Sequence, residues 1–191
     1  MTLAMSWDEW TRHDGVALAE RVRKGELKPA ELAQQAAAGV AKVDSSLSGV
    51  VELFDDAIAS PRDNGTNLDG PFAGLPFLMK DLGPTMKGRL QEMGSLLMRG
   101  NRAAADTFLT GKMRQAGLNL IGRTTTPEFG VCSSADNPAV YVTRNPWNTD
   151  YTTCGSSAGS AAMRPAWFRS RTPPTAAARS GFQPASTATS G

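Results

Sequence analysis

The fold class of this chain is decided by the stretch Leu75-Pro76-Phe77-Leu78-Met79, which runs directly into Lys80-Asp81. Five nearly continuous apolar residues are typical of a strand that is buried on both faces, as in a parallel sheet. The change from apolar to charged residues is abrupt. We therefore expect a core strand whose end carries Lys80 to the edge of the core.

The sequence that follows supplies the other parts of a parallel crossover. The segment Asp106–Gly117 is predicted to be a capped helix that carries Phe108, Leu109, Met113 and Ala116, with Gly117 as its C-terminal glycine. Residues 118–123, Leu-Asn-Leu-Ile-Gly-Arg, form a second apolar strand candidate. Strand, helix and strand in this order indicate an α/β sheet with helices packed on its faces.

Upstream of this unit the sequence is mainly helical. Apolar residues at helical spacing predict one helix over Asp14–Arg23 and a second over Pro29–Asp44, with Pro29 in its first turn. Residues 49–54 are a short strand candidate. Residues 124–153 are rich in Thr, Asn, Pro and Ser without sustained periodicity, which is typical of a functional loop.

Two features could carry chemistry, and each has an ordinary alternative. Lys80 ends an apolar run, where desolvation lowers the pKa of an amine and makes it a proton acceptor. Its alternative is a solvated lysine paired with Asp81. The run Gly155-Ser156-Ser157-Ala158-Gly159-Ser160 combines hydroxyls with residues small enough for close backbone approach. Its alternative is a flexible linker.

Composition argues against several other kinds of site. Cys132 and Cys154 do not form a disulfide framework or a CxxC metal site, and His13 is the single histidine. Metal catalysis and histidine-dependent triads are therefore poorly supported. There is no signal-like N-terminus and no apolar run close to 18 residues, so a cytoplasmic location is expected.

The character of the sequence changes after Met163. Residues 164–191 lack Asp, Glu, Lys, Leu, Ile, Val and Tyr, and hold four arginines that account for the slight basic excess of the chain. Such a segment buries too little apolar surface to offset its ordering entropy. We therefore divide the chain into a body, residues 1–163, and a tail predicted to be disordered, residues 164–191.

Several motifs of the body, in order and spacing, resemble the amidase signature family, and within it bacterial amidases of the 6-aminohexanoate-cyclic-dimer hydrolase type. The similarity extends from the N-terminal helices through Ala162. It is carried by residues 74–82 around Lys80, 114–117 before the second strand, 122–124 at its end, 126–130, 143–148 and the glycine-serine run 155–160. The resemblance implies an α/β amidase signature fold with a mixed β-sheet core covered by α-helices.

The resemblance also implies roles for individual residues. Lys80 corresponds to the general base of a Ser-cisSer-Lys triad, and Ser156 to the serine held across a cis peptide bond that relays the proton. Gly155, Ser157 and Gly159 correspond to the supporting active-site loop. Cys154 is an alternative nucleophile, but no histidine lies nearby in sequence to activate it.

The nucleophilic serine of the family stands in a Gly-Gly-Ser-Ile-Arg-Ile-Pro motif, which this chain lacks. Reading residues 172–183 as codons and shifting the frame admits His-Ala-Thr-Asp-Gly-Gly-Gly-Ser-Ile-Arg-Ile-Pro. The serine codon would then straddle Ala178 and Arg179, and Ser180 is out of phase with it. We therefore interpret the tail as the product of a frameshift, so that the oxyanion and nucleophile loop is absent.

The resemblance implies an amide hydrolase that needs neither cofactor nor metal, acts on a small-molecule amide, and binds no nucleic acid or membrane. Without its nucleophile, we expect this chain to turn over little or no substrate. The alternative is a non-catalytic binding protein whose basic tail contacts an acidic partner. Four arginines spread over the tail make only a weak electrostatic footprint for that role.

Overall fold

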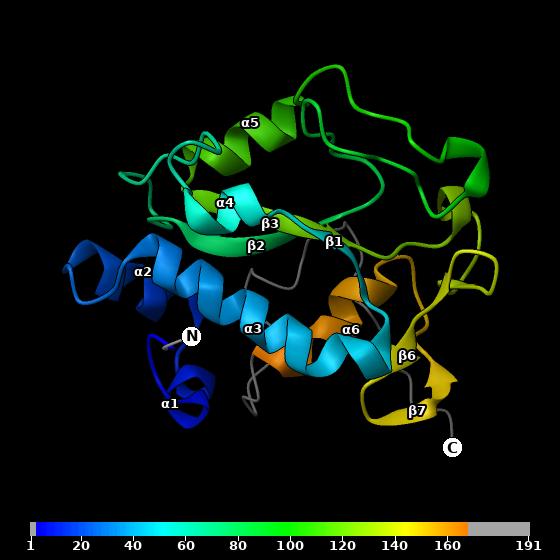
Figure 1. Cartoon of the computed structure of the whole chain (residues 1–191), viewed down its shortest axis with the longest axis horizontal. Coiled ribbons are helices and arrows are strands. Elements are labelled where there is room, and N and C mark those ends of the chain that lie inside the picture. Colours follow the sequence, from blue (N-terminus) through cyan, green and yellow to red (C-terminus); the bar gives the residue numbers. More distant parts are fainter. Residues whose placement is uncertain (1–2, 168–191) are drawn as a thin grey trace.

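The computed structural model describes residues 3–167. Residues 168–191 of the predicted tail lie outside the described residues, whereas its first four residues, 164–167, are helical and not disordered as expected. Helices and strands follow one another in the order shown in Figure 1. The helices are α1 (Trp7–Arg12), α2 (Gly15–Arg23), α3 (Pro29–Leu47), α4 (Asp55–Ala59), α5 (Phe108–Gln115) and α6 (Ala158–Trp167), with short 3₁₀ turns η1 (Leu96–Met98) and η2 (Glu128–Gly130). The strands are β1 (Val50–Leu53), β2 (Leu75–Lys80), β3 (Leu118–Thr124), β4 (Asp136–Asn137), β5 (Tyr141–Val142), β6 (Arg144–Asn145) and β7 (Asn148–Thr152).

The central sheet has three strands in the order β1-β3-β2. Strand β2 runs parallel to β3, from the pair Leu75–Leu118 to the pair Lys80–Thr124, and α5 makes the connection between them. Strand β1 is antiparallel to β3. The predicted crossover and the expected α/β fold with a mixed sheet between helices are both confirmed.

Each face of the sheet has its own hydrophobic core. On one face Leu75, Leu78 and Ile121 pack with apolar residues of α1, α2, α3 and α6. On the other, Phe77, Met79 and Leu120 join residues of α4 and the loop before α5, with Met113 of α5 packed against them. Figure 1 shows the same division, with α3 and α6 on one side of the sheet and α4 and α5 on the other. All six residues of β2 are buried, as its apolar sequence predicts.

The predicted helices near the N-terminus are confirmed, with small changes at their ends. Helix α2 starts after Asp14, whose carboxylate accepts a hydrogen bond from the Ala17 amide at 2.8 Å. Helix α3 continues past Asp44 to Leu47, because Leu47 adds a further buried apolar residue to its stripe.

Helix α5 differs from the prediction at its start. Its N-cap is Thr107 and not Asp106, and the Thr107 side chain accepts a hydrogen bond from the Thr110 amide. Asp106 instead accepts a hydrogen bond from the Lys87 amide at 2.6 Å. Phe108 and Leu109, two of the apolar residues carried by this helix, are exposed at 81% and 46%. The C-terminal glycine is as predicted, since Gly117 has a φ of +93°.

The segment after β3 is more regular than its composition suggested. Antiparallel pairs β4–β5 and β6–β7 form two small hairpins within it. The Tyr141 hydroxyl fixes the first of them, since it donates to the Thr126 carbonyl at 2.8 Å and accepts from the Thr126 amide at 3.0 Å. Periodicity could not reveal these strands because most are only two residues long. In residues 3–167, no helix is both long and apolar enough to cross a membrane.

Candidate active site

Lys80 is the last residue of β2 and is 8% exposed. Its ammonium group makes no hydrogen bond or ion pair within the described structure. Burial lowers the pKa of the Lys80 amine, because desolvation disfavours the charged form. Lys80 is thus a buried amine without a carboxylate partner, which suits a proton acceptor.

The alternative pairing of Lys80 with Asp81 is wrong, because Asp81 is bound by another cation. Arg123 on β3 donates to Asp81 Oδ1 at 2.9 Å, to Glu92 Oε2 at 2.8 Å and to Glu52 Oε2 at 3.0 Å. Burial raises the pKa of Asp81, and the charge of Arg123 opposes that shift. The guanidinium therefore holds Asp81 and leaves Lys80 unpaired.

The glycine-serine run lies where the hairpin region leads into α6. Gly155 has a φ of +99°, a conformation that favours glycine, and its amide donates to the Ser133 carbonyl at 2.6 Å. Helix α6 begins at Ala158, inside the run, so the linker interpretation is wrong. Ser157 is 4% exposed, and its hydroxyl is buried with no hydrogen-bond partner in the described structure.

Gly159 lies in unusually close contact with the main chain. A Cβ atom at this position would stand 2.3 Å from the Gly49 carbonyl oxygen and 2.5 Å from the Thr125 amide nitrogen. The amide and the carbonyl are themselves hydrogen-bonded at 3.0 Å. Only a residue without a side chain allows α6 to approach the ends of β1 and β3 in this way.

Thr124 links the glycine-serine run to the strand that carries Lys80. Its hydroxyl lies 3.2 Å from that of Ser160 in the first turn of α6, and its Cα is the register partner of Lys80 across the sheet. The structure therefore brings Lys80 and the start of α6 to the same end of the sheet. The roles assigned to Ser156 and its neighbours stay predictions.

The peptide bonds of the described residues are all trans, so the cis bond expected at Ser156 is absent from this structure. A non-proline cis bond costs about 3 to 4 kcal/mol, and it forms only where surrounding structure imposes it. Ala178 and Arg179, where the nucleophile was expected, lie outside the described residues. Cys154 is exposed and pairs with Ser134 in an isolated β-bridge.

Threonine and tyrosine residues that were assigned no role from the sequence support this end of the sheet. Thr125 and Thr143 share a hydroxyl hydrogen bond of 2.7 Å, and Thr143 also donates to the Ser48 carbonyl at 2.9 Å. A cavity of about 310 Å³ adjoins them, lined in part by Asp44, Ser48, Asp81, Glu92 and Tyr141. Burial raises the pKa of Tyr141 to about 12. The richness of residues 124–153 in hydroxyl side chains was the signal in the sequence that could have pointed to these hydrogen bonds.

Comparison with known proteins decides the family. The profile of the family described as Amidase matches residues 31–165, which is more than half of the chain. The chain belongs to the amidase family. The match includes both Lys80 and the glycine-serine run.

Amidase relatives of known name share this part of the chain. The 6-aminohexanoate-cyclic-dimer hydrolase of Paenarthrobacter ureafaciens is 38% identical over 158 residues, which cover 81% of this chain and 31% of the relative. The hydrolase of the same name from Pseudomonas sp. (strain NK87) is 37% identical over 158 residues, again with 81% and 31% covered.

Solved amidase structures show the same fold. The structure of 6-aminohexanoate cyclic dimer hydrolase complexed with substrate superimposes with a TM-score of 0.73 at 35% identity, covering 82% of this chain and 32% of that one. A bacterial aryl acylamidase of the amidase signature family also gives 0.73, at 28% identity, with 81% and 34% covered. The chain therefore spans about a third of the length of the amidases it matches.

Proposed function

We propose that this chain descends from an amide hydrolase that uses a serine nucleophile, a relay serine and a lysine base. Lys80 is the base in this proposal, and Ser156 is the relay. The observation that carries it is the buried, unpaired amine of Lys80 at the end of a strand, within the segment that matches the amidase family. A lysine whose pKa is lowered holds more neutral amine near neutral pH, so it can accept a proton.

In the proposed reaction the neutral amine of Lys80 takes the hydroxyl proton of Ser156, which in turn takes the proton of the nucleophilic serine. The nucleophile adds to the amide carbonyl, and the C–N bond breaks as the departing nitrogen receives the proton back along the same route. Water then hydrolyses the acyl ester. Main-chain N–H groups beside the nucleophile would stabilise the oxyanion.

We also propose that the chain itself is inactive or nearly so. Residues 164–191 contain no Gly-Gly-Ser-Ile-Arg motif, and the family match ends at residue 165, close to the change of character after Met163. This supports a body of residues 1–163 that descends from the amidase domain and a tail read in another frame. Loss of the nucleophile from a catalytic triad lowers the rate by about six orders of magnitude.

The proposed substrate of the complete enzyme is a small-molecule amide. The relatives that support this class are named for a cyclic dimer of 6-aminohexanoate and for aryl acylamides.

The proposal is tested by amide hydrolysis with a matched variant. The chain and its Lys80→Ala variant are incubated with the cyclic dimer of 6-aminohexanoate and with a chromogenic anilide, and amine release is followed. The expected result is that both proteins match the buffer blank. A saturable rate that is abolished by Lys80→Ala would show that a working nucleophile is present, and would refute the proposed inactivity.

A further inference from the structure

A second cavity, of about 710 Å³, lies between the α4 side of the sheet and the loop that leads to α5. Neither Lys80 nor Ser156 is among its described lining residues. Charged side chains from several segments define it, namely Asp56, Asp63, Lys87, Arg89, Asp106 and Arg114. What this cavity binds does not depend on the proposed function.

Each of the two arginines in the cavity is held by its own carboxylate. Arg89 lies 2.6 Å from Asp56 Oδ2, and hydrogen bonding by Arg89 lowers the pKa of that carboxyl group. Arg114 Nε lies 3.4 Å from Asp106 Oδ2. Their charges are thus largely balanced within the protein, while both side chains line the cavity.

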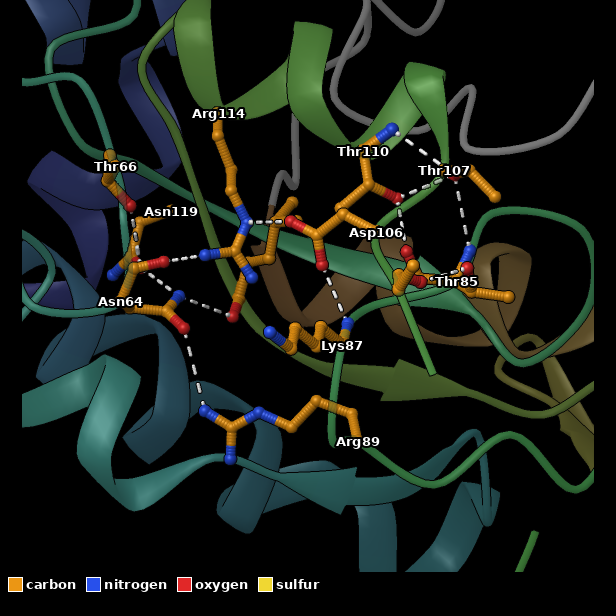
Figure 2. Close-up of polar contacts among 12 residues, drawn as sticks. Asn64, Thr66, Thr85, Lys87, Arg89, Asp106, Thr107, Thr110, Arg114 and Asn119 are labelled. Atoms are coloured by element: carbon orange, nitrogen blue, oxygen red, sulfur yellow. Dashed lines mark hydrogen bonds and ion pairs between the residues drawn. The ribbon is translucent and has the colours of Figure 1, made fainter. Parts of the chain in front are cut away.

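Further contacts fix the positions of both guanidinium groups. Arg89 stacks over the ring of Phe54, with 4.2 Å from its Cζ atom to the ring centroid. Arg114 also donates to the main-chain carbonyl of Asn64. The Asn64 amide group is itself anchored to the Leu120 carbonyl at 3.3 Å. Figure 2 shows Arg89, Arg114 and Asn64 around one space, with both arginines in contact with Asn64, so little side-chain ordering remains to be done on binding.

Lys87 brings the third positive charge and has no counterion in the described structure. Its main-chain amide donates to Asp106 Oδ1 at 2.6 Å, which fixes the backbone. Its ammonium group makes no hydrogen bond or ion pair with any described residue. In Figure 2 the Lys87 side chain points between Arg89 and Arg114, toward Asn64.

We infer that this cavity binds a phosphate group, either free or carried as a monoester. Three cationic groups approach from different directions, which suits a tetrahedral oxyanion better than a planar carboxylate. Lys87 is the cation of the cavity that has no ion-pair partner in the described structure, and the two arginines supply N–H donors; the three carboxylates of the lining balance the three cations in number. Asp63 is an exposed carboxylate without a partner in the described structure, and its repulsion weakens the site.

The test is a titration of the ¹⁵N-labelled chain, followed by amide chemical shifts, at constant ionic strength. The probes are inorganic phosphate, glycerol phosphate and acetate. We expect phosphate to shift the amide signals of Gly65, Gly88 and Ala105, which line the cavity. If only inorganic phosphate binds, the site takes the free anion. If glycerol phosphate binds as well, the site also takes a phosphate group carried as a monoester.

Three variants make the assignment specific. Lys87→Gln is expected to weaken phosphate binding about tenfold, because it removes a charge-assisted hydrogen bond. Asp63→Asn is expected to strengthen binding about threefold, by removing a repulsive charge. Lys24→Gln, which removes an equal charge from an exposed site at the end of α2, is the matched control and should change nothing.

Several results would overturn the inference. These are the absence of phosphate-dependent shifts at the cavity, unchanged binding in Lys87→Gln, equal weakening in Lys24→Gln, and acetate binding as tight as phosphate binding. The same spectra report whether each variant is folded, so a loss of binding through unfolding would be recognised.

Discussion

Replacing Arg123 with methionine is expected to destabilise the fold strongly. The guanidinium is 3% exposed and contacts three carboxylates, of which Glu52 and Glu92 are 38% and 23% exposed. Those two can turn toward water, but the Asp81 side chain is 1% exposed and cannot. Breaking a buried ion pair by removing one partner costs about 3 to 5 kcal/mol. Most of that free energy comes from the uncompensated charge of Asp81.

The same burial of Asp81 fixes the sign of the pH dependence. Burial places the folded-state pKa of Asp81 above its unfolded value. The cost in folding free energy therefore belongs to the ionised carboxylate, and this cost disappears as pH falls through the folded-state pKa. Loss of Arg123 raises that pKa further. The destabilisation by Arg123→Met should therefore be smaller at mildly acidic pH than at neutral pH.

The assay is urea denaturation followed by tryptophan fluorescence, since Trp10 is buried in the core. A double-mutant cycle with Asp81→Asn should show a coupling energy of about 2 kcal/mol. The control is Arg12→Met, which breaks an exposed pair with Asp8 and should cost less than about 0.5 kcal/mol. If Arg123→Met lost as little stability as the control, or if the cycle showed no coupling, Arg123 would not be compensating the buried charge of Asp81.

Three further predictions concern the site and its supports. Lys80→Met should raise the free energy of unfolding at neutral pH by about 1 kcal/mol, because it removes a buried amine whose charged form is disfavoured. This gain in stability should shrink as pH rises toward 10.5, where the amine is neutral in the unfolded chain as well. Urea titrations of both proteins at two pH values measure it. Gly159→Ala should lower the melting temperature by several degrees, because the added methyl group clashes with main-chain atoms. Gly111→Ala, at an open helical position, should instead stabilise the protein by about 0.5 to 1 kcal/mol. Calorimetry measures both variants, and equal melting temperatures would contradict the predicted clash at Gly159. Tyr141→Phe should cost about 1 to 2 kcal/mol by leaving the Thr126 main chain without its hydroxyl partner, and amide exchange at Thr126 measures this directly.

The sequence predicted the central crossover because its signals are local. The apolar run of β2, the glycine after α5 and the apolar run of β3 each depend on neighbouring residues alone, and all three lie where expected. The antiparallel direction of β1 is different, because it depends on how α3 turns the chain back across the sheet. Local pattern predicted only a short strand at residues 49–54, and the family resemblance implied a mixed sheet without saying which strand is antiparallel.

Ion pairs between residues far apart in the chain are the part of the site that local sequence could not predict. Lys80 and Asp81 are adjacent in the chain, so their pairing was the simple alternative, yet Arg123 from another strand binds Asp81. The exposure of Phe108 and Leu109 was missed for a similar reason, since helical spacing does not say which side of the helix meets the sheet. Contacts between distant segments decide both outcomes.

We propose that the nucleophile is encoded in a neighbouring reading frame of the same gene. The direct measurement is the nucleotide sequence of the gene across codons 160–191, translated in all three frames. We predict Gly-Gly-Ser-Ile-Arg in the shifted frame, with the serine codon spanning the junction of Ala178 and Arg179. A sequence in which no frame encodes that motif would contradict the claim.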